Sequence, residues 1–333
     1  MPVEVQRGYK FAVISVPDSR AGGSPAPLVQ LPDGFAVSPD LPPNALDTWQ
    51  QNIGLFHRQE LEECRLFLWS LAPSAHPEVL DNENEELGKR AYCLFLGLLI
   101  GVPYFSAGRL TRLTGANADG TTRARQLTGF SRTYYTLGAP APVLSTSKMR
   151  LAAQLATALH QFNLSPGRER IERSVRVFRE ACESPHLDDR LHQFVRCAEG
   201  LAVPRNAVEF TNRLSRVCAG RNRNHLREMY QIRSGIEHLH GPYDRLPKRL
   251  RKGQRHQGLL MRTVEAEALA RYLLTTLLMN PTLWPHFRDR TTIDAFWKLP
   301  AKQFNTLWPG RLAFPSILRS FDSATVPQNQ DPQ

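Results

Sequence analysis

Helical periodicity across residues 145–280 is the feature that most limits the folds open to this chain. Apolar residues recur there at three- and four-residue intervals, as in Met149, Ala152 and Leu155. This spacing places apolar side chains on one face of an α-helix. The sequence therefore predicts a series of amphipathic helices that bury these faces against one another.

Proline and glycine divide this region into separate helices. Breaks are expected at Ser165–Gly167, Pro185 and Pro204, because proline cannot continue a helix. Asn206, followed by Glu209 three residues later, resembles an N-terminal capping box.

The first 144 residues are mixed in character. Residues 17–43, rich in Pro and Gly, are expected to be loop. Asn82–Ile100 is expected to be a helix with carboxylates in its first turn, where they complement the helix dipole. Three short segments are expected to be strands: Tyr9–Val16, Leu66–Leu71 and Gln126–Leu137.

The expected fold class is therefore α+β. We predict a mixed N-terminal domain over 1–144 with an accessory or sensor role, and an all-α bundle over 145–280. Residues 281–333 are expected to be a C-terminal extension whose last ~10 residues are disordered.

Composition favours a cytoplasmic protein without a metal or a cofactor. No pair of the five cysteines is spaced as CxxC, so no zinc or redox motif is present. The cysteines are expected to be small core residues. The longest apolar run, Ala91–Phe105, is interrupted by Gly and Pro and is short for a membrane span. No signal peptide is recognised and no membrane partner is expected.

The positive charge is concentrated in one segment. Residues 204–256 hold 13 Lys and Arg against 4 Asp and Glu, which is +9 of the net +11 of the chain. A polyanion such as RNA is the expected partner, although a solvated basic face explains charge alone equally well. The residues expected to bind the nucleic-acid backbone are Arg221, Arg223, Arg227, Arg245, Lys248, Arg249, Arg251 and Lys252.

Arg233 and His238 are the candidate catalytic pair. Other Arg–His pairs at similar spacing occur in the chain, but only this pair lies at the end of a well-patterned helix. Arginine binds phosphate through a planar fork of donors, and histidine exchanges a proton near neutral pH. Together they suit metal-independent cleavage of RNA.

The segment from Tyr230 to His238, YQIRSGIEH, resembles the signature helix of HEPN domains, particularly the Apea-like branch. The upstream Phe194–Ala202 resembles the earlier core helix of that family, with Glu199 at the position of its acid. The resemblance implies a helical, dimerising endoribonuclease of toxin–antitoxin, anti-phage or RNA-processing type, with an antitoxin or regulatory protein as a further partner. It implies that Arg233 holds the phosphate, that His238 is the general acid or base and that Glu199 orients one of them. Ser234 departs from the Asn, Asp or His of many active members.

The spacing of the pair favours a homodimer. Five residues advance about 500° along a helix, so Arg233 and His238 point roughly 140° apart. A distorted last turn, or two copies that meet and share the site, would bring them together.

Several alternatives remain open from the sequence. Arg233 and Glu237 can form an i,i+4 ion pair, His240 can replace His238 as the base, and Glu199 can be merely solvated. Ser234 and His240 are possible accessory residues. The alternative function is a catalytically inactive RNA-binding or dimerisation module.

Overall fold

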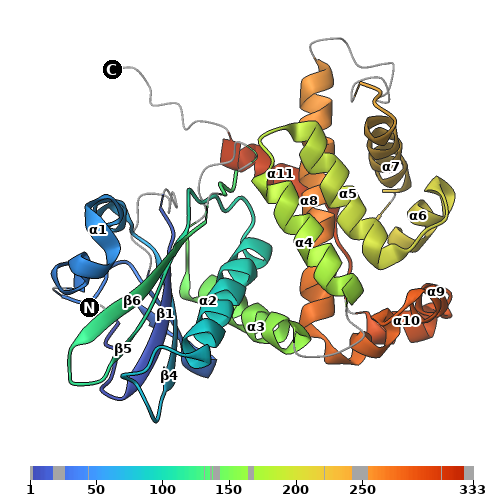
Figure 1. Ribbon diagram of the computed structural model, residues 1–333. Coiled ribbons are helices and arrows are strands. Elements are labelled where there is room, and N and C mark those ends of the chain that lie inside the picture. The colour runs from blue at the N-terminus through green and yellow to red at the C-terminus, as the bar shows by residue number, and fades with distance from the viewer. Residues whose placement is uncertain are drawn as a thin grey trace. The chain divides into compact units, whose positions relative to one another are not determined.

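The computed structural model describes residues 3–17, 27–43, 45–130, 132–135, 137, 143–163, 169–220, 222–241, 254–308 and 310–325. The protein has an α+β fold that divides into two compact units (Figure 1). The first unit, Met1–Thr136 with Ala141–Gln161, contains the sheet. The second unit, Leu137–Pro140 with Phe162–Gln333, is helical.

The first unit is built on a six-stranded antiparallel sheet with the order β2-β3-β4-β1-β5-β6. Its strands are β1 Tyr9–Ser15, β2 Val29–Gln30, β3 Phe35–Ser38, β4 Phe67–Pro73, β5 Thr111–Asn117 and β6 Thr122–Gly129, and the short 3-10 helix η1 spans Pro32–Gly34. Because β1 is central, six of its seven residues are buried, which explains its run of apolar side chains.

Helices α1 Ala45–Glu63 and α2 Asn82–Gly101 cover opposite faces of this sheet (Figure 1). On the α1 side, Trp49 stacks on Phe11 at 5.7 Å between ring centroids and donates a hydrogen bond to the Thr122 carbonyl. On the α2 side, the buried Lys10 ammonium pairs with Asp81 at 2.8 Å, at the start of α2.

Helix α3, Thr146–Asn163, packs on α2 at a close crossing. A Cβ added at Gly97 of α2 would lie 2.2 Å from the Ala152 carbonyl oxygen, so glycine is required there. Because of this contact, residues 141–161 belong to the first unit. The prediction that the helical domain begins at residue 145 is therefore wrong for this helix.

The second unit has the following helices: α4 Glu169–Glu183, α5 Leu187–Ala202, α6 Ala207–Leu214, α7 Arg223–Glu237, α8 Arg255–Met279, η3 Pro281–Phe287, α9 Arg290–Trp297, α10 Ala301–Leu307 and α11 Phe314–Thr325. Helix α5 contacts α4, α7 and α8 and carries the buried side chains of Leu191, Phe194 and Cys197. Its position makes α5 the scaffold of this unit (Figure 1).

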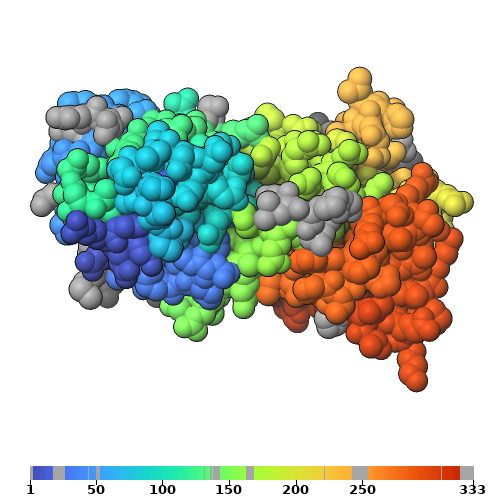
Figure 2. Space-filling view, turned by 60° about the horizontal axis from the view of Figure 1, so that its bottom comes forward, coloured from blue at the N-terminus to red at the C-terminus, as the bar shows by residue number. Residues whose placement is uncertain are grey.

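The segment after α8 is folded onto the helical unit. Trp297, Phe304 and Trp308 form part of one aromatic cluster and are buried. In Figure 2 the orange atoms of α8 and of the segment that follows it form a continuous surface. The division at residue 280 expected from the sequence is therefore not a division between compact units.

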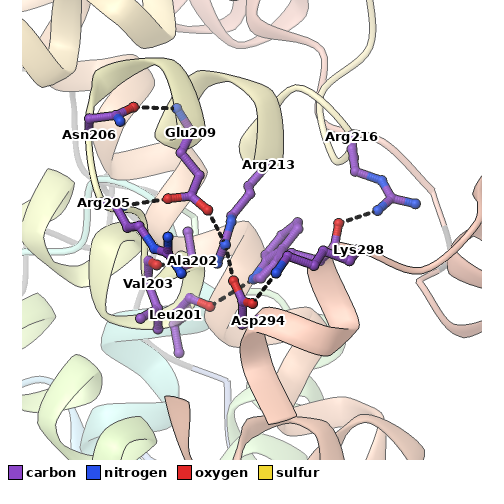
Figure 3. Close-up of polar contacts among 11 residues, drawn as sticks. Leu201, Ala202, Val203, Arg205, Asn206, Glu209, Arg213, Arg216, Asp294 and Lys298 are labelled. Atoms are coloured by element: carbon purple, nitrogen blue, oxygen red, sulfur yellow. Dashed lines mark hydrogen bonds and ion pairs between the residues drawn. The ribbon is translucent and has the colours of Figure 1, made fainter. Parts of the chain in front are cut away.

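Arg213 connects α5, α6 and α9 (Figure 3). Its guanidinium donates to the carbonyls of Ala202 at 2.8 Å and Val203 at 3.2 Å, where α5 ends. It also pairs with Glu209 and with Asp294 of α9. Cations are favourable at the C-terminus of a helix, where carbonyls lack intrahelical partners.

Several local expectations differ from the structure. The prediction of a strand over Gln126–Leu137 was wrong in its bounds, since β6 spans Thr122–Gly129. The segment 17–43, expected to be loop, also contains β2 and β3. The sequence also predicts a basic loop over residues 241–262, but helix α8 begins within that range, at Arg255. The disordered tail expected at the C-terminus lies mostly outside the described residues, and α11 continues to Thr325.

The five cysteines are buried and form no disulfide, as expected. Burial raises the pKa of the Cys182 thiol to about 12, which makes it an inert core side chain. None of the described helices combines the length and apolar character needed to cross a bilayer.

Candidate functional site

Helix α7 carries the candidate arginine because its apolar residues fix one face toward the core. Leu226, Met229 and Ile232 are fully buried at three-residue spacing. Arg233 follows Ile232 and is therefore at the edge of the buried face, where its side chain is 16 % exposed. The contact between α5 and α7 positions it against Glu199.

The structure brings Arg233 and Glu199 together. Their Nη2 and Oε2 atoms are 2.8 Å apart, and both side chains are mostly buried. Arg233 also forms the i,i+4 ion pair with Glu237 that the sequence offered as an alternative role. The Tyr230 ring, with its centroid 6.0 Å from the guanidinium carbon, lies beside the pair.

Burial controls the protonation of Glu199. It raises the pKa of this carboxyl to about 7, with Arg233 lowering it and Glu237 raising it. Loss of hydration therefore outweighs the attraction to the guanidinium. A carboxyl that titrates near neutral pH can give or take a proton under physiological conditions.

His192 is a member of this cluster that the sequence reasoning missed. His192, Arg196 and Glu199 are spaced i, i+4 and i+7, so they share one face of α5. The pKa of His192 is lowered, mainly by burial and then by repulsion from the nearby Arg233 and Arg196. Its Nε2 atom and the Arg233 Nε atom are buried and accept or donate no hydrogen bond within the described part of the chain. The seven-residue spacing from Glu199 was the signal that could have identified it.

His238 is at the end of α7 and is exposed. The helix stops at Glu237 in a Schellman arrangement: the Leu239 N–H donates to the Ile236 carbonyl and the His240 N–H to the Gly235 carbonyl. Leu239 has φ 59°, a left-handed conformation that usually requires glycine. Among the described residues no hydrogen bond or ion pair joins the His238 side chain to Arg233 or Glu199.

The remaining predicted residues are only partly described. His240 is exposed one turn beyond α7, and Ser234 is half-buried on it. Arg227 is exposed, and Arg223 donates to the Asn212 side chain. The other residues expected to bind RNA lie outside the described residues: Arg221, Arg245, Lys248, Arg249, Arg251 and Lys252. Within the described part no three His, Cys, Asp or Glu side chains gather as metal ligands.

Comparison with known proteins found no match to a protein-family model, to a curated protein or to a solved structure. The likeness of YQIRSGIEH to the HEPN signature therefore remains a prediction based on these residues.

The raised pKa of Glu199 predicts a dependence of stability on pH. The folded protein keeps this proton to about pH 7, whereas the unfolded chain loses it near the ordinary pKa of 4.5. Between these values the folded state binds more protons, so raising the pH lowers the free energy of unfolding, by about 3 kcal/mol at most. Urea unfolding at about pH 5 and about pH 8 measures this loss. We expect Glu199→Gln to lose clearly less than the wild type, and equal losses in both would contradict the assignment.

Proposed function

We propose that the protein is a metal-independent endoribonuclease of HEPN type, with a defence or toxin-like role. The observation that carries the proposal is the 2.8 Å contact of Arg233 with Glu199 from a different helix. It combines a guanidinium, which suits a phosphate, with a carboxyl whose pKa is about 7. The neighbouring His192 has a lowered pKa and is a neutral imidazole at pH 7.

The proposed reaction uses the 2′-hydroxyl of RNA. Its oxygen bonds to phosphorus as the bond to the 5′-oxygen breaks, which leaves a 2′,3′-cyclic phosphate and a 5′-hydroxyl. A base takes the 2′ proton, and an acid gives a proton to the departing 5′-oxygen. Arg233 would hold the phosphate oxygens, His238 would be the acid or the base, and Glu199 would orient Arg233.

The proposed assembly is a homodimer acting on RNA in the cytoplasm, under control of an antitoxin or another regulatory protein. The exposure of His238 at the end of α7 supports a shared site, because an exposed imidazole can reach the Arg233 of a second copy. In such a site each copy would supply the guanidinium of one centre and the imidazole of the other.

A second candidate is an inactive RNA-binding or dimerisation module. It is favoured by the two carboxylates, Glu199 and Glu237, that already pair with the Arg233 guanidinium. To bind a phosphate, Arg233 would have to give up part of this pairing. The protonation of Glu199 near neutral pH reduces that obstacle.

Incubation of the purified protein with total RNA in EDTA separates the two functions. We expect cleavage by the wild type, and a rate about 100- to 10,000-fold lower for His238→Ala, since this is the usual contribution of general acid–base catalysis. His76→Ala is the matched control and should cleave at the wild-type rate, because His76 is also an exposed histidine but belongs to the first unit, which contains none of the residues proposed for cleavage.

The outcomes discriminate clearly. Cleavage at background level in all three proteins, with RNA binding retained, would support the inactive module. A requirement for divalent metal would reject the proposed mechanism but not nuclease activity. A cyclic phosphate at the new 3′ ends is the expected product.

A further inference from the structure

The helical unit has a polar cavity whose lining includes Arg196 and Gly200 of α5, the helix that also carries Glu199. It encloses about 390 Å³ and is formed by α4, α5 and the segment that leads into α9. Five arginines from these three segments line it: Arg170, Arg173, Arg196, Arg288 and Arg290. Such a convergence of guanidinium groups is unusual unless an anion accompanies it, because like charges repel.

Most of these arginines lack carboxylate partners. Within the described part of the chain, no ion pair is formed by Arg173, Arg196, Arg288 or Arg290. In contrast, Arg176 on the same helix as Arg173 pairs with Glu180. The paired Arg176 is not among the residues that line the cavity, whereas the lining Arg173 forms no ion pair in the described part of the chain.

The two carboxylates at the cavity do not cancel its charge. Glu169 and Asp289 line it beside five arginines, so its formal balance is three positive charges. The Asp289 side chain caps α9 by accepting a hydrogen bond of 2.9 Å from the Thr292 N–H. The Asp289 carboxylate is therefore held by a backbone N–H of α9 and is also attracted by the arginines beside it.

Arg170 is close enough to the other arginines to be affected by their positive charge. It is half-buried, and its Nη1 atom is 3.4 Å from the Gly200 carbonyl oxygen. The pKa of the Arg170 guanidinium is lowered, mainly by burial and then by repulsion from Arg173 and Arg290. A bound anion would remove this repulsion and replace lost hydration with charge-assisted hydrogen bonds.

The lining also indicates the kind of anion. Arginine forks match the paired oxygens of phosphate groups, and the volume is within the range of small-ligand sites. None of the described lining residues is aromatic, and Val177 is the single large apolar side chain among them. The cavity therefore offers many contacts for charged oxygens and no ring on which a base could stack.

We propose that this cavity binds a compact, multiply charged phosphate ligand, a diphosphate or triphosphate group held by Arg170, Arg173 and Arg290. The proposal does not depend on RNA cleavage. The group can be inorganic triphosphate, the tail of a nucleotide or the 5′-triphosphate end of an RNA. The chemistry recognised at the cavity is the same in each case.

Isothermal titration calorimetry of the full chain with inorganic triphosphate tests the proposal. We expect saturable binding, weaker with pyrophosphate and weaker still with monophosphate. Arg173→Glu and Arg290→Glu should each weaken triphosphate binding about ten-fold or more, which corresponds to the loss of a hydrogen bond to a charged group. Arg176→Glu, outside the cavity on the same helix, should change it by less than about two-fold.

Two further arms identify the source of the phosphate. Equal affinity for inorganic triphosphate and ATP would indicate a free small ligand, and tighter binding of a 5′-triphosphorylated oligonucleotide would indicate an RNA end; both support the cavity. Absence of saturable binding to all these probes would overturn the proposal. Equal weakening by Arg176→Glu and Arg173→Glu would also overturn it, since general surface charge would then explain binding. Circular dichroism and thermal melting would verify that the variants fold, and RNA cleavage in EDTA is measured separately.

Discussion

Replacing Arg213 with alanine should lower the free energy of unfolding of the helical unit by about 3–5 kcal/mol. The Arg213 side chain is 6 % exposed and contacts two carboxylates and two carbonyls on three elements (Figure 3). Alanine would leave Glu209 and Asp294 facing each other without the cation between them. The carbonyls of Ala202 and Val203 would lose their donors at the end of α5.

Urea unfolding of the full chain, followed by tryptophan fluorescence, measures this effect. If the two units unfold in separate transitions, the transition of the helical unit is the one expected to move. Arg227→Ala is the control, because Arg227 is exposed on α7, and it should change stability by less than about 0.5 kcal/mol. Similar losses in both variants would contradict the role assigned to Arg213.

Replacing Arg233 with lysine should reduce RNA cleavage at least about 100-fold while RNA binding changes little. Lysine keeps the positive charge but has no planar fork. Arg233 uses separate nitrogens for Glu199 and Glu237, and one ammonium cannot reproduce this geometry. The phosphate would therefore be attracted but not oriented.

Cleavage rates in EDTA and RNA affinities from filter binding would be compared for this variant. Arg176→Lys is the matched control, because Arg176 of α4 pairs with Glu180 and is not among the residues expected to bind RNA, and it should cleave at nearly the wild-type rate. A small effect of Arg233→Lys on cleavage would mean that Arg233 supplies charge alone. Equal losses of binding and cleavage would mean that Arg233 contributes to RNA affinity rather than to the chemical step.

The helices of the second unit were predictable because their signal is local. The spacing of Leu191, Phe194 and Leu201 places them on one amphipathic face of α5. Pro185 prevents α4 from continuing, because its ring leaves no backbone N–H for a helical hydrogen bond. The Asn206 cap is also local, since its side chain accepts from the Glu209 N–H. These features need no information from distant parts of the chain.

Elements of the first unit were harder to predict because their signal is not local. The strand β5, Thr111–Asn117, contains Arg112, Gly115 and Asn117. It pairs with β1 and β6, and all its residues except Arg112 are buried. Glycine and asparagine disfavour strands by propensity. Helix α1 is interrupted at Gly54, with φ 71°, and its regular pattern is correspondingly weak.

The candidate site was predictable only in part. The structure pairs Glu199 with Arg233, two residues that the sequence analysis named as candidates, and the Arg233–Glu237 ion pair follows from helical spacing. His192 was missed because its relation to Arg233 exists only where α5 lies against α7. The arginine cavity was missed for a similar reason, since residues near 170, 196 and 289 meet only in the folded chain.

The sequence by itself determined the helical register of α4 and α5, the helix break at Pro185 and the concentration of positive charge, because periodicity, proline and charge act along the chain. Only the tertiary structure decided that Glu199 holds its proton to about pH 7 and that five arginines share one cavity. The physical reason is that hydration and charge repulsion depend on distances between segments. Those distances are set by how α5 packs against α4 and α7.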